Sequence, residues 1–399
     1  MTIDGKPVRL TSGSKVGIYV HIPFCRQKCL YCDFCSFPGV SPERIEAYTE
    51  RLCSQIREIC SQTEHMEADT VFFGGGTPTL LSEGQWDRIL SALQDSVRLS
   101  ADAEITTECN PATAGPAKLK AMRTLGINRL SVGVQSIHPG ELRTLGRIHT
   151  EEQFEQLVRN AREAGFERIS FDLMFGFPGQ TEESWLSTLR KATGLNPEHL
   201  SVYALQLEEG TPLYRDRASY VFPDEDTVAR MYDTARTFLE GEGFSRYEVS
   251  NYARPGCECR HNLKYWNCED YLGFGISAHS LVGRTRFYYP GDMESFLRGT
   301  AVPVLEEQLS DDRMEEEYAV LRLRLSTGLD MGEAEKRFGE HFARRFLPVL
   351  RTMADRHLLI CAERNGGEIY RIPDPFFFTE NDILSELLAC VQEPASFSK

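Results

Sequence analysis

The sequence predicts an α/β fold in which a parallel sheet carries helices on its outer side and a small α+β region follows. Two observations lead to this prediction. From residue 17 to about residue 240, short apolar strand patterns alternate with amphipathic helix patterns, and six such units in succession are typical of a parallel sheet. After Gly243 the rhythm changes, and from about residue 309 the pattern is that of a separate small domain.

The first part of the chain repeats one unit, a short apolar strand followed by a helix. Strands are expected at residues 17–24, 68–75, 103–108, 129–135, 168–175 and 199–205. Helices are expected at residues 42–60, 85–97, 117–125, 151–164, 182–192 and 224–240. In βα folds the chemistry lies where the strands end, so polar and glycine-rich strand ends mark candidate site residues.

The second part of the chain mixes short strands with helices. Strands are expected at residues 247–252, 272–281 and 286–289, and a loop rich in cysteine and aromatic residues at 257–268. Helices are expected at residues 312–325, 331–350 and 381–388, and a hairpin at 358–363 and 369–372 around Asn365-Gly366-Gly367. Helices followed by a hairpin suggest a winged-helix-like domain. Its basic pair, Arg344-Arg345, gives little support for DNA reading, so we expect a lid or docking role.

The composition is that of an acidic globular protein with many thiols. The 399 residues carry a formal net charge of −15 and include twelve cysteines. An acidic surface disfavours nucleic acid as a partner and tight binding to anionic lipid. No apolar stretch is long enough to span a membrane, and no apolar segment precedes the first strand. Many cysteines without a signal segment indicate metal ligation in a reducing compartment, so we expect a cytoplasmic protein.

Three cysteines follow the first predicted strand at C-x3-C-x2-C spacing. Cys25, Cys29 and Cys32 can ligate three irons of a [4Fe–4S] cube and leave the fourth iron open to a small chelating ligand. Tyr31 adds an aromatic ring next to the last cysteine. The alternative is a zinc knot or a set of buried thiols, but zinc knots commonly use C-x2-C pairs with two further ligands. The spacing therefore favours a cluster.

A glycine-rich turn, Gly74-Gly75-Gly76-Thr77-Pro78, ends the second predicted strand. Glycines allow a ligand to lie directly against the backbone. Polar residues mark later strand ends: Glu108, Gln135, Arg147 and Asp172. Carboxylates can accept from a ribose diol or face a sulfonium, and an arginine can bind a carboxylate. Each residue alone is more commonly a structural hydrogen-bond former, but their succession favours one shared ligand.

These segments resemble the radical-SAM superfamily and, within it, the oxygen-independent coproporphyrinogen III oxidase-like family. The resemblance rests on residues 19–25, 131–136 and 172–181, and extends from about Gly17 to near the C-terminus. The resemblance narrows the repeated βα part to a partial (β/α)6 barrel (17–245). With the change of pattern noted above, we expect an N-terminal tail (1–16), barrel-closing strands with the loop around residues 261–266 (246–305) and a C-terminal winged-helix-like domain (306–399). The resemblance further implies that S-adenosylmethionine (SAM) binds at Tyr19, Gly75, Gly76, Thr77, Glu108, Gln135, Arg147, Asp172 and Ala204.

The hexapeptide His261-Asn262-Leu263-Lys264-Tyr265-Trp266 matches the H-N-x-x-Y-W signature of the haem-chaperone branch of that family. A neutral imidazole is a good axial ligand for haem iron, and Tyr265 and Trp266 offer flat apolar faces for a porphyrin. The alternative is that His261 is structural and the aromatic rings pack into the core. The resemblance implies haem as a ligand and haem-acceptor proteins of the respiratory membrane as partners.

Other thiols leave alternatives open. Cys257, Cys259, His261 and Cys268 could bind zinc or a second iron–sulfur unit, although their spacing is not a common zinc pattern. The oxidase branch has a fourth cysteine where this chain has Phe34, and the next residue, Cys35, fits neither branch. That branch also has a longer N-terminal segment than the sixteen residues found here.

The favoured interpretation is a cytoplasmic haem chaperone that holds a [4Fe–4S] cluster and SAM and hands haem to acceptor proteins. The alternative is a radical-SAM oxidoreductase that acts on a tetrapyrrole, of the coproporphyrinogen III dehydrogenase type. Whether the protein is an enzyme is therefore open at this point. An exposed cluster loop could also form the subunit contact of a homodimer.

Overall fold

The computed structural model describes residues 2–3, 6–8, 15–62, 66–364 and 367–392. The chain forms two compact units. The barrel unit comprises Met1–Ser245, Tyr252–Lys264 and Glu269–Gln308, and the C-terminal unit comprises Arg246–Asn251, Tyr265–Cys268 and Leu309–Lys399. In the described part of the chain, no helix has both the length and the apolar composition needed to cross a membrane.

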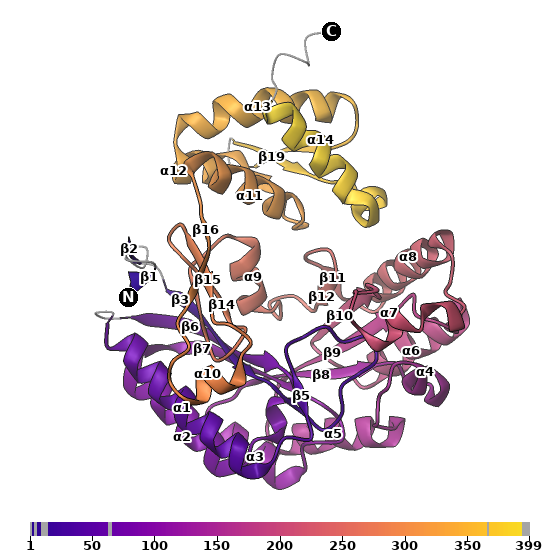
Figure 1. Ribbon diagram of the computed structural model, residues 1–399. Coiled ribbons are helices and arrows are strands. Elements are labelled where there is room, and N and C mark those ends of the chain that lie inside the picture. Colours follow the sequence, from indigo (N-terminus) through magenta and orange to yellow (C-terminus); the bar gives the residue numbers. More distant parts are fainter. Residues whose placement is uncertain (1, 4–5, 9–14, 63–65, 365–366, 393–399) are drawn as a thin grey trace. The chain divides into compact units, whose positions relative to one another are not determined.

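The barrel unit is built on a twelve-stranded sheet whose central part is parallel (Figure 1). Six parallel strands lie side by side in the order in which the chain makes them, as successive βα units require. They are β3 (Val16–Ile22), β6 (Glu67–Gly75), β7 (Arg98–Cys109), β8 (Arg129–Gln135), β9 (Arg168–Phe175) and β10 (His199–Ala204). The predicted α/β fold with a parallel sheet is confirmed.

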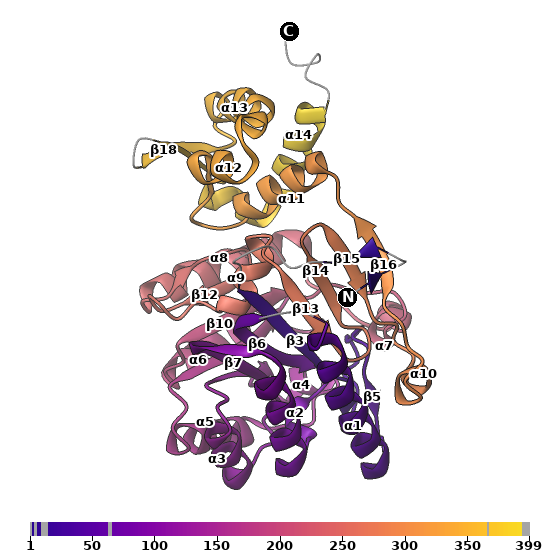
Figure 2. The ribbon, with the colours of Figure 1, turned by 90° about the vertical axis from the view of Figure 1, so that its left-hand side faces the viewer.

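Helices cover the outer side of this sheet (Figures 1 and 2). The larger ones are α1 (Pro42–Cys60), α2 (Glu83–Ser96), α3 (Pro116–Thr124), α5 (Glu151–Glu163), α6 (Glu182–Gly194) and α8 (Glu225–Gly241), and the short α4 (Pro139–Thr144) and α7 (Pro212–Arg215) lie in connections. Five of these helices begin after a Ser or Thr whose side chain accepts a backbone N–H of the first turn: Ser41, Ser82, Thr150, Thr181 and Thr211. Such caps satisfy N–H groups that the helix itself leaves without acceptors, which explains where these helices start.

Further strands extend the sheet at both edges. Beside β3 lie β13 (Tyr271–Phe274), β14 (His279–Val282), β15 (Thr285–Tyr288) and β16 (Val304–Gln308), with α10 (Met293–Leu297) between the last two. At the other edge lie β12 (Asn251–Ala253) and β11 (Ser245–Arg246). Short strand pairs are β1 (Thr2–Ile3) with β2 (Lys6–Pro7), and β4 (Phe24–Cys25) with β5 (Phe37–Pro38). Since β13 runs parallel to β3 and β14 runs back antiparallel, the sheet is mixed.

Three predictions for residues 245–308 were wrong. The strand expected at residues 247–252 is mostly a bend, because β11 ends at Arg246 and β12 begins at Asn251. The single strand expected at residues 272–281 is the antiparallel pair β13 and β14, because Gly275 and Ser277 have φ of +93° and +53° and turn the chain. The loop expected at residues 257–268 contains helix α9 (Arg260–Trp266). Its seven residues are too few to show a clear helical period in the sequence.

The C-terminal unit combines helices with a small antiparallel sheet. Its elements are α11 (Asp311–Leu323), β17 (Leu329–Asp330), α12 (Met331–Phe338), α13 (Glu340–Asp355), β18 (Ile360–Arg364), β19 (Gly367–Arg371) and α14 (Glu380–Gln392). The helix expected at residues 331–350 is two helices, because Gly339 has a φ of +79° and ends α12. In the predicted hairpin turn, Asn365 and Gly366 lie outside the described residues. Helices and hairpin share a core that includes Phe342, Phe346 and Tyr370.

A glycine on β13 allows the close approach of the next strand, and its substitution tests this packing. A Cβ atom on Gly273 would lie 2.4 Å from the carbonyl oxygen of His279, whereas a Cβ on Gly84 in α2 would meet nothing within 4 Å. We expect Gly273→Ala to lower the free energy of unfolding by about 1–3 kcal/mol. The control Gly84→Ala should leave it unchanged or raise it by up to about 1 kcal/mol. Urea denaturation measures both, and equal stability of the two variants would contradict this account.

Candidate functional site

Alternate residues of the parallel strands face the interior of the barrel. On β6, Val71 and Phe73 belong to the core under the helices, where Phe73 packs edge-on against Trp86 of α2 at 4.9 Å. Phe72 faces the other way and stacks on Tyr19 of β3, with ring centroids 6.4 Å apart. Because side chains alternate along a strand, every second residue of each parallel strand contributes to this interior.

The three cysteines of the C-x3-C-x2-C motif lie together in the loop that follows β3. All three are partly buried. Burial raises the pKa of Cys25, and it raises the pKa of Cys32 to about 11, with neighbouring cysteines adding to the shift. Thr77 Oγ1 donates to Cys25 Sγ at 3.7 Å. Thiolates in such a place need a cationic partner, and iron supplies one, so these residues fit a cluster.

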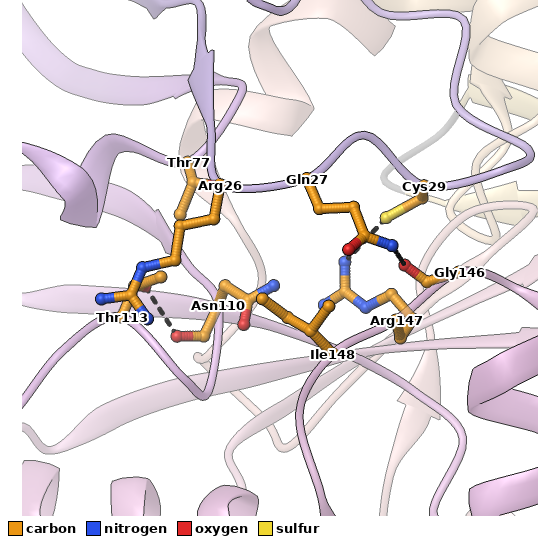
Figure 3. Close-up of a pocket in the computed structure, with 9 residues that line it drawn as sticks. All are labelled: Arg26, Gln27, Cys29, Thr77, Asn110, Thr113, Gly146, Arg147 and Ile148. Atoms are coloured by element: carbon orange, nitrogen blue, oxygen red, sulfur yellow. Dashed lines mark hydrogen bonds between the residues drawn. The ribbon is translucent and has the colours of Figure 1, made fainter. Parts of the chain in front are cut away.

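Arg147 joins the cysteine loop to the end of β8. Its Nη1 donates to Cys29 Sγ at 3.4 Å, and its Nη2 donates to the carbonyl of Gly133. Figure 3 shows this guanidinium pointing to the sulfur at the edge of a small, open pocket. The pocket is lined by Arg26, Gln27, Cys29, Thr77, Asn110, Thr113, Gly146, Arg147 and Ile148. Arg147 Nε is buried without a hydrogen-bond partner among the described residues, and a carboxylate ligand would supply one.

Cys35 lies apart from this arrangement. Its Sγ points to the carbonyl of Gly291 at 3.9 Å. Its own carbonyl accepts from His21 Nε2 at 2.8 Å, so His21 Nδ1 is the nitrogen that accepts from the Tyr19 hydroxyl at 3.0 Å. The hydrogen bond between His21 and the Cys35 carbonyl therefore holds the end of the cysteine loop against β3.

Two partly buried carboxylates face the interior beyond the glycine-rich turn. Glu108 Oε2 accepts the backbone N–H of Gly75 at 3.2 Å, and Asp172 accepts from Ser131 Oγ at 3.0 Å. Burial raises the pKa of Glu108 to about 8, with the charge of Asp172 adding to the shift, and burial also raises the pKa of Asp172. Neither carboxylate forms a salt bridge among the described residues. Arg129 and Arg147 act on Asp172 only through their charges, without a direct ion pair, so two carboxylates here fit a positively charged ligand such as a sulfonium.

The backbone at the end of β8 is bent where Gln135 stands. Gln135 has a φ of +65°, and the N–H of Ser136 donates to the carbonyl of Val134 at 2.8 Å. A non-glycine residue in this conformation is strained, and such strain occurs preferentially at binding sites. The glycine at position 133 leaves room here, since a Cβ there would lie 3.1 Å from Arg147 Nη2 and 3.3 Å from Gln135 Nε2. The structure therefore brings these two predicted site residues together.

The remaining predicted SAM residues occupy strand ends of the same interior. Gly75 has a φ of +104°, and a Cβ on Gly76 would lie 2.7 Å from the backbone of Phe24, so both positions require glycine. Ala204 is the last residue of β10. Tyr31 packs against Leu145, Met174 and Phe177.

His261 lies at the opposite end of the barrel interior, near the strand starts. Its Nδ1 is 2.8 Å from Thr70 Oγ1, and its ring stacks on Phe72 with centroids 5.4 Å apart. The side chain is only 2% exposed, and burial lowers its pKa to about 3. Tyr265 and Trp266 follow on the same helix, α9. The indole N–H of Trp266 is buried and has no hydrogen-bond partner within the described residues.

Among the described residues, the other thiols near His261 do not converge with it on one metal position. Cys259 Sγ donates to Glu104 at 3.6 Å, and Cys268 is part of the core of the C-terminal unit. A mononuclear metal needs ligand atoms that converge on one point. Among the described residues, the one such set of three is Asp312, Glu315 and His341, not the cysteines of residues 257–268.

Sequence reasoning missed three interior residues with clear roles: Thr70, Glu104 and Ser131. On its own strand, each is separated by an even number of positions from a predicted site residue or a glycine, so the two positions lie on the same face of the sheet. Alternation along a strand was therefore a usable signal, but which alternate residues meet across the barrel depends on register.

The comparisons with known proteins agree with this geometry. Residues 19–192 match the family model of the radical SAM superfamily. The chain is similar in structure to coproporphyrinogen III oxidase (HemN) from Escherichia coli, with a TM-score of 0.79 and 24% sequence identity over 94% of this chain and 90% of that one. The fold and the site thus define a radical-SAM protein, a class that implies a [4Fe–4S] cluster and SAM as cofactors.

Proteins with similar sequences identify the family of this chain within the radical-SAM class. The chain is 35% identical to Heme chaperone HemW of Bacillus subtilis over 353 residues, which are 86% of this chain and 92% of the relative. It is 39% identical to Heme chaperone HemW of Escherichia coli over 67% of this chain and 70% of the relative. It is also 40% identical to the mitochondrial radical S-adenosyl methionine domain-containing protein 1 of Mus musculus, over 69% and 63%. The chain belongs to the HemW family.

The positions of the loop thiols predict which of them the cluster needs. We expect Cys29→Ser to abolish cluster formation, because it removes one of three ligands. The matched variant Cys35→Ser should keep the cluster, because its sulfur points to Gly291. Anaerobic reconstitution followed by iron analysis and electron paramagnetic resonance measures both. Loss of the cluster in Cys35→Ser would assign this thiol a ligand role and contradict the prediction.

The raised pKa of Glu108 predicts a pH dependence of SAM binding. Below pH 8 the Glu108 carboxyl holds a proton, which a cationic ligand must displace. The affinity for SAM should therefore rise with pH, by up to about tenfold per pH unit below pH 8. Isothermal titration calorimetry of the anaerobic reconstituted protein between pH 6 and 9 measures this, and Glu108→Gln should flatten the profile. The same slope in both proteins would exclude Glu108 as the titrating group.

Proposed function

We propose that this protein is a haem chaperone that binds haem, holds a [4Fe–4S] cluster and SAM, and delivers haem to acceptor proteins. One observation carries the proposal: the H-N-x-x-Y-W signature is intact on helix α9, in a chain that shares 35% identity with proteins named Heme chaperone HemW over most of both lengths.

The proposed cofactor residues follow from the geometry at the strand ends. Cys25, Cys29 and Cys32 hold the cluster, while Thr77 and Arg147 donate hydrogen bonds to two of their sulfurs. For SAM, Glu108 and Asp172 face its positive charge and Arg147 takes its carboxylate. Tyr19, Gly75, Gly76, Gln135 and Ala204 complete the proposed lining. When bound, the reduced cluster supplies an electron to SAM.

The proposed haem residues are His261, Tyr265 and Trp266. The imidazole of His261 is neutral, as an axial iron ligand must be. The buried indole N–H of Trp266 can donate to a haem propionate. As placed, however, His261 leaves no room for a porphyrin, since its ring is enclosed by Thr70 and Phe72. Haem binding therefore requires a local change at α9.

The proposed partners follow from the family resemblance and from the surface. Acceptors are proposed to be respiratory enzymes of the membrane, served from the cytoplasm. The cysteine loop presents Phe34, which is 60% exposed, and such an apolar residue beside a cluster suits a contact with an acceptor or a second copy of this chain.

The haem proposal predicts a specific dependence on His261. The purified protein should bind about one haem per chain, and His261→Ala should lose this binding while the cluster remains, because the axial ligand is gone. A haem titration followed by the Soret band measures it. The control His341→Ala removes a half-exposed histidine of the C-terminal unit and should bind haem normally. Equal haem uptake by wild type and His261→Ala would exclude this ligand.

A second candidate function is an oxidoreductase that acts on a tetrapyrrole. The observation that favours it is the set of residues suited to SAM, in which Glu108, Asp172 and Arg147 lie in one interior beside the cysteine loop. If this function holds, anaerobic incubation with coproporphyrinogen III, SAM and a reductant should yield protoporphyrinogen. We expect no product, and chromatography of the oxidised porphyrins measures it.

A further inference from the structure

The start of helix α9 is held inside the barrel by Glu104 of β7. This carboxylate is 3% exposed. Its Oε1 accepts the backbone N–H of His261 at 3.1 Å, and its Oε2 accepts the backbone N–H of Arg260 at 3.2 Å. The first N–H groups of a helix have no acceptor within the helix, so Glu104 supplies them and fixes where α9 begins.

The side chain of His261 is held by the neighbouring strand. Thr70 of β6 occupies its Nδ1, and Phe72 covers a face of the ring. The backbone of β3 lies close as well, because a Cβ on Gly17 would be 3.4 Å from His261 Cε1 and 2.8 Å from Lys264 Cδ. The ring is thus enclosed by side chain and backbone from β3 and β6.

Lys264 is a third anchor, one turn further along α9. It is 4% exposed. Its ammonium lies 2.9 Å from Asp69 Oδ1 and 2.9 Å from Glu269 Oε2, and it donates to the carbonyl of Lys15 at 3.0 Å. A buried ammonium with two carboxylates is strongly destabilised when it loses its partners, so this contact opposes displacement of the helix.

The far end of α9 belongs to the other unit. The division between the two compact units falls after Lys264, and Tyr265–Cys268 are part of the C-terminal unit. Within that unit, Arg337 donates to the carbonyls of Asn267 and Cys268 at 2.7 and 2.6 Å. A seven-residue helix has little stability of its own, so α9 depends on these two sets of contacts, one in each unit.

We propose that α9 is a latch with two states. The structure shows the seated state. In it, α9 is held by Glu104, by Thr70 and by the groups that bind Lys264, and haem iron cannot reach His261. In the released state the start of α9 leaves the barrel interior and exposes the imidazole to haem iron. This inference rests on the proposed function, in which His261 is the haem ligand. Since haem binds only the released state, the apparent dissociation constant for haem equals the intrinsic constant divided by the fraction of molecules in the released state.

The latch and a merely structural role predict opposite effects on haem binding when Thr70 or Glu104 is substituted. If Thr70 and Glu104 only supported the fold of a ready-made haem site, their loss would weaken haem binding. If they hold the latch closed, their loss shifts the equilibrium to the released state and strengthens haem binding. The sign of the effect therefore decides between the two accounts.

The first test compares two threonines of the barrel interior. Thr70→Val removes the partner of His261 Nδ1 and keeps the shape of the side chain. Thr106→Val is its matched control, because Thr106 is equally buried, its register partner is Phe72, and its hydroxyl has no partner among the described residues. We expect Thr70→Val to bind haem about five- to tenfold more tightly and to associate faster, and Thr106→Val to match wild type. Stopped-flow haem binding measures both.

The second test uses the backbone of α9. Hydrogen–deuterium exchange of peptides covering residues 258–266 should be slow in the haem-free protein, because Glu104 binds two of these N–H groups. It should become faster in Glu104→Gln, and in wild type with saturating haem. Continued protection in the haem complex would overturn the latch, and so would wild-type or weaker haem binding in Thr70→Val.

A third variant separates the latch from the haem ligand. Haem uptake should disappear in His261→Ala and in the double variant Thr70→Val/His261→Ala. Loss of uptake in His261→Ala, together with an unchanged affinity in Thr70→Val, would leave the proposed function standing and remove the latch. Full uptake by His261→Ala would remove the ligand assignment and the latch with it. Cluster content and thermal melting show whether each variant folds.

Discussion

The parallel register of the six central strands is the constraint on which the functional features depend. It aligns Gly17 with Thr70 and Thr70 with Glu104 at one level of the barrel interior, and Tyr19 with Phe72 and Thr106 at the next. Strands that run in the same direction bring all their starts to one end and all their ends to the other. The interior therefore has two chemically different ends, and each is built from several strands.

At the end where the strands finish, thiols, carboxylates and Arg147 surround a place suited to a cationic ligand. At the end where they start, Glu104, Thr70 and Asp69 receive helix α9. These two groups of polar residues differ in whether the chain itself supplies their interaction partners. The first leaves Glu108 and Asp172 without an ion pair among the described residues, whereas the second satisfies a helix start and a buried ammonium within the chain itself. Burial of His261 follows from the second, and it is the reason why haem access is a conformational question in this protein.

Much of the fold was predictable because its signals are local. The helix over residues 42–60 and the strand over residues 129–135 were predicted with the bounds the structure has. Predictions were wrong where one residue changes the chain direction, at Ser277 and Gly339, both of which have positive φ. The short helix α9 was missed because much of its stability comes from Glu104, Asp69 and Lys15, which are far away in sequence.

By itself, the sequence determined the chemistry available to this protein: the spacing of three cysteines, the glycine-rich turn, the polar strand ends and the H-N-x-x-Y-W hexapeptide. These are patterns of neighbouring residues, and neighbours stay together however the chain folds. Only the tertiary structure decided which of them act together and which are accessible. It turned Cys35 away from the cluster loop and put Gln135 beside Arg147 over Gly133. It also enclosed His261 between Thr70 and Phe72, because contacts across a barrel depend on the register of strands distant in sequence.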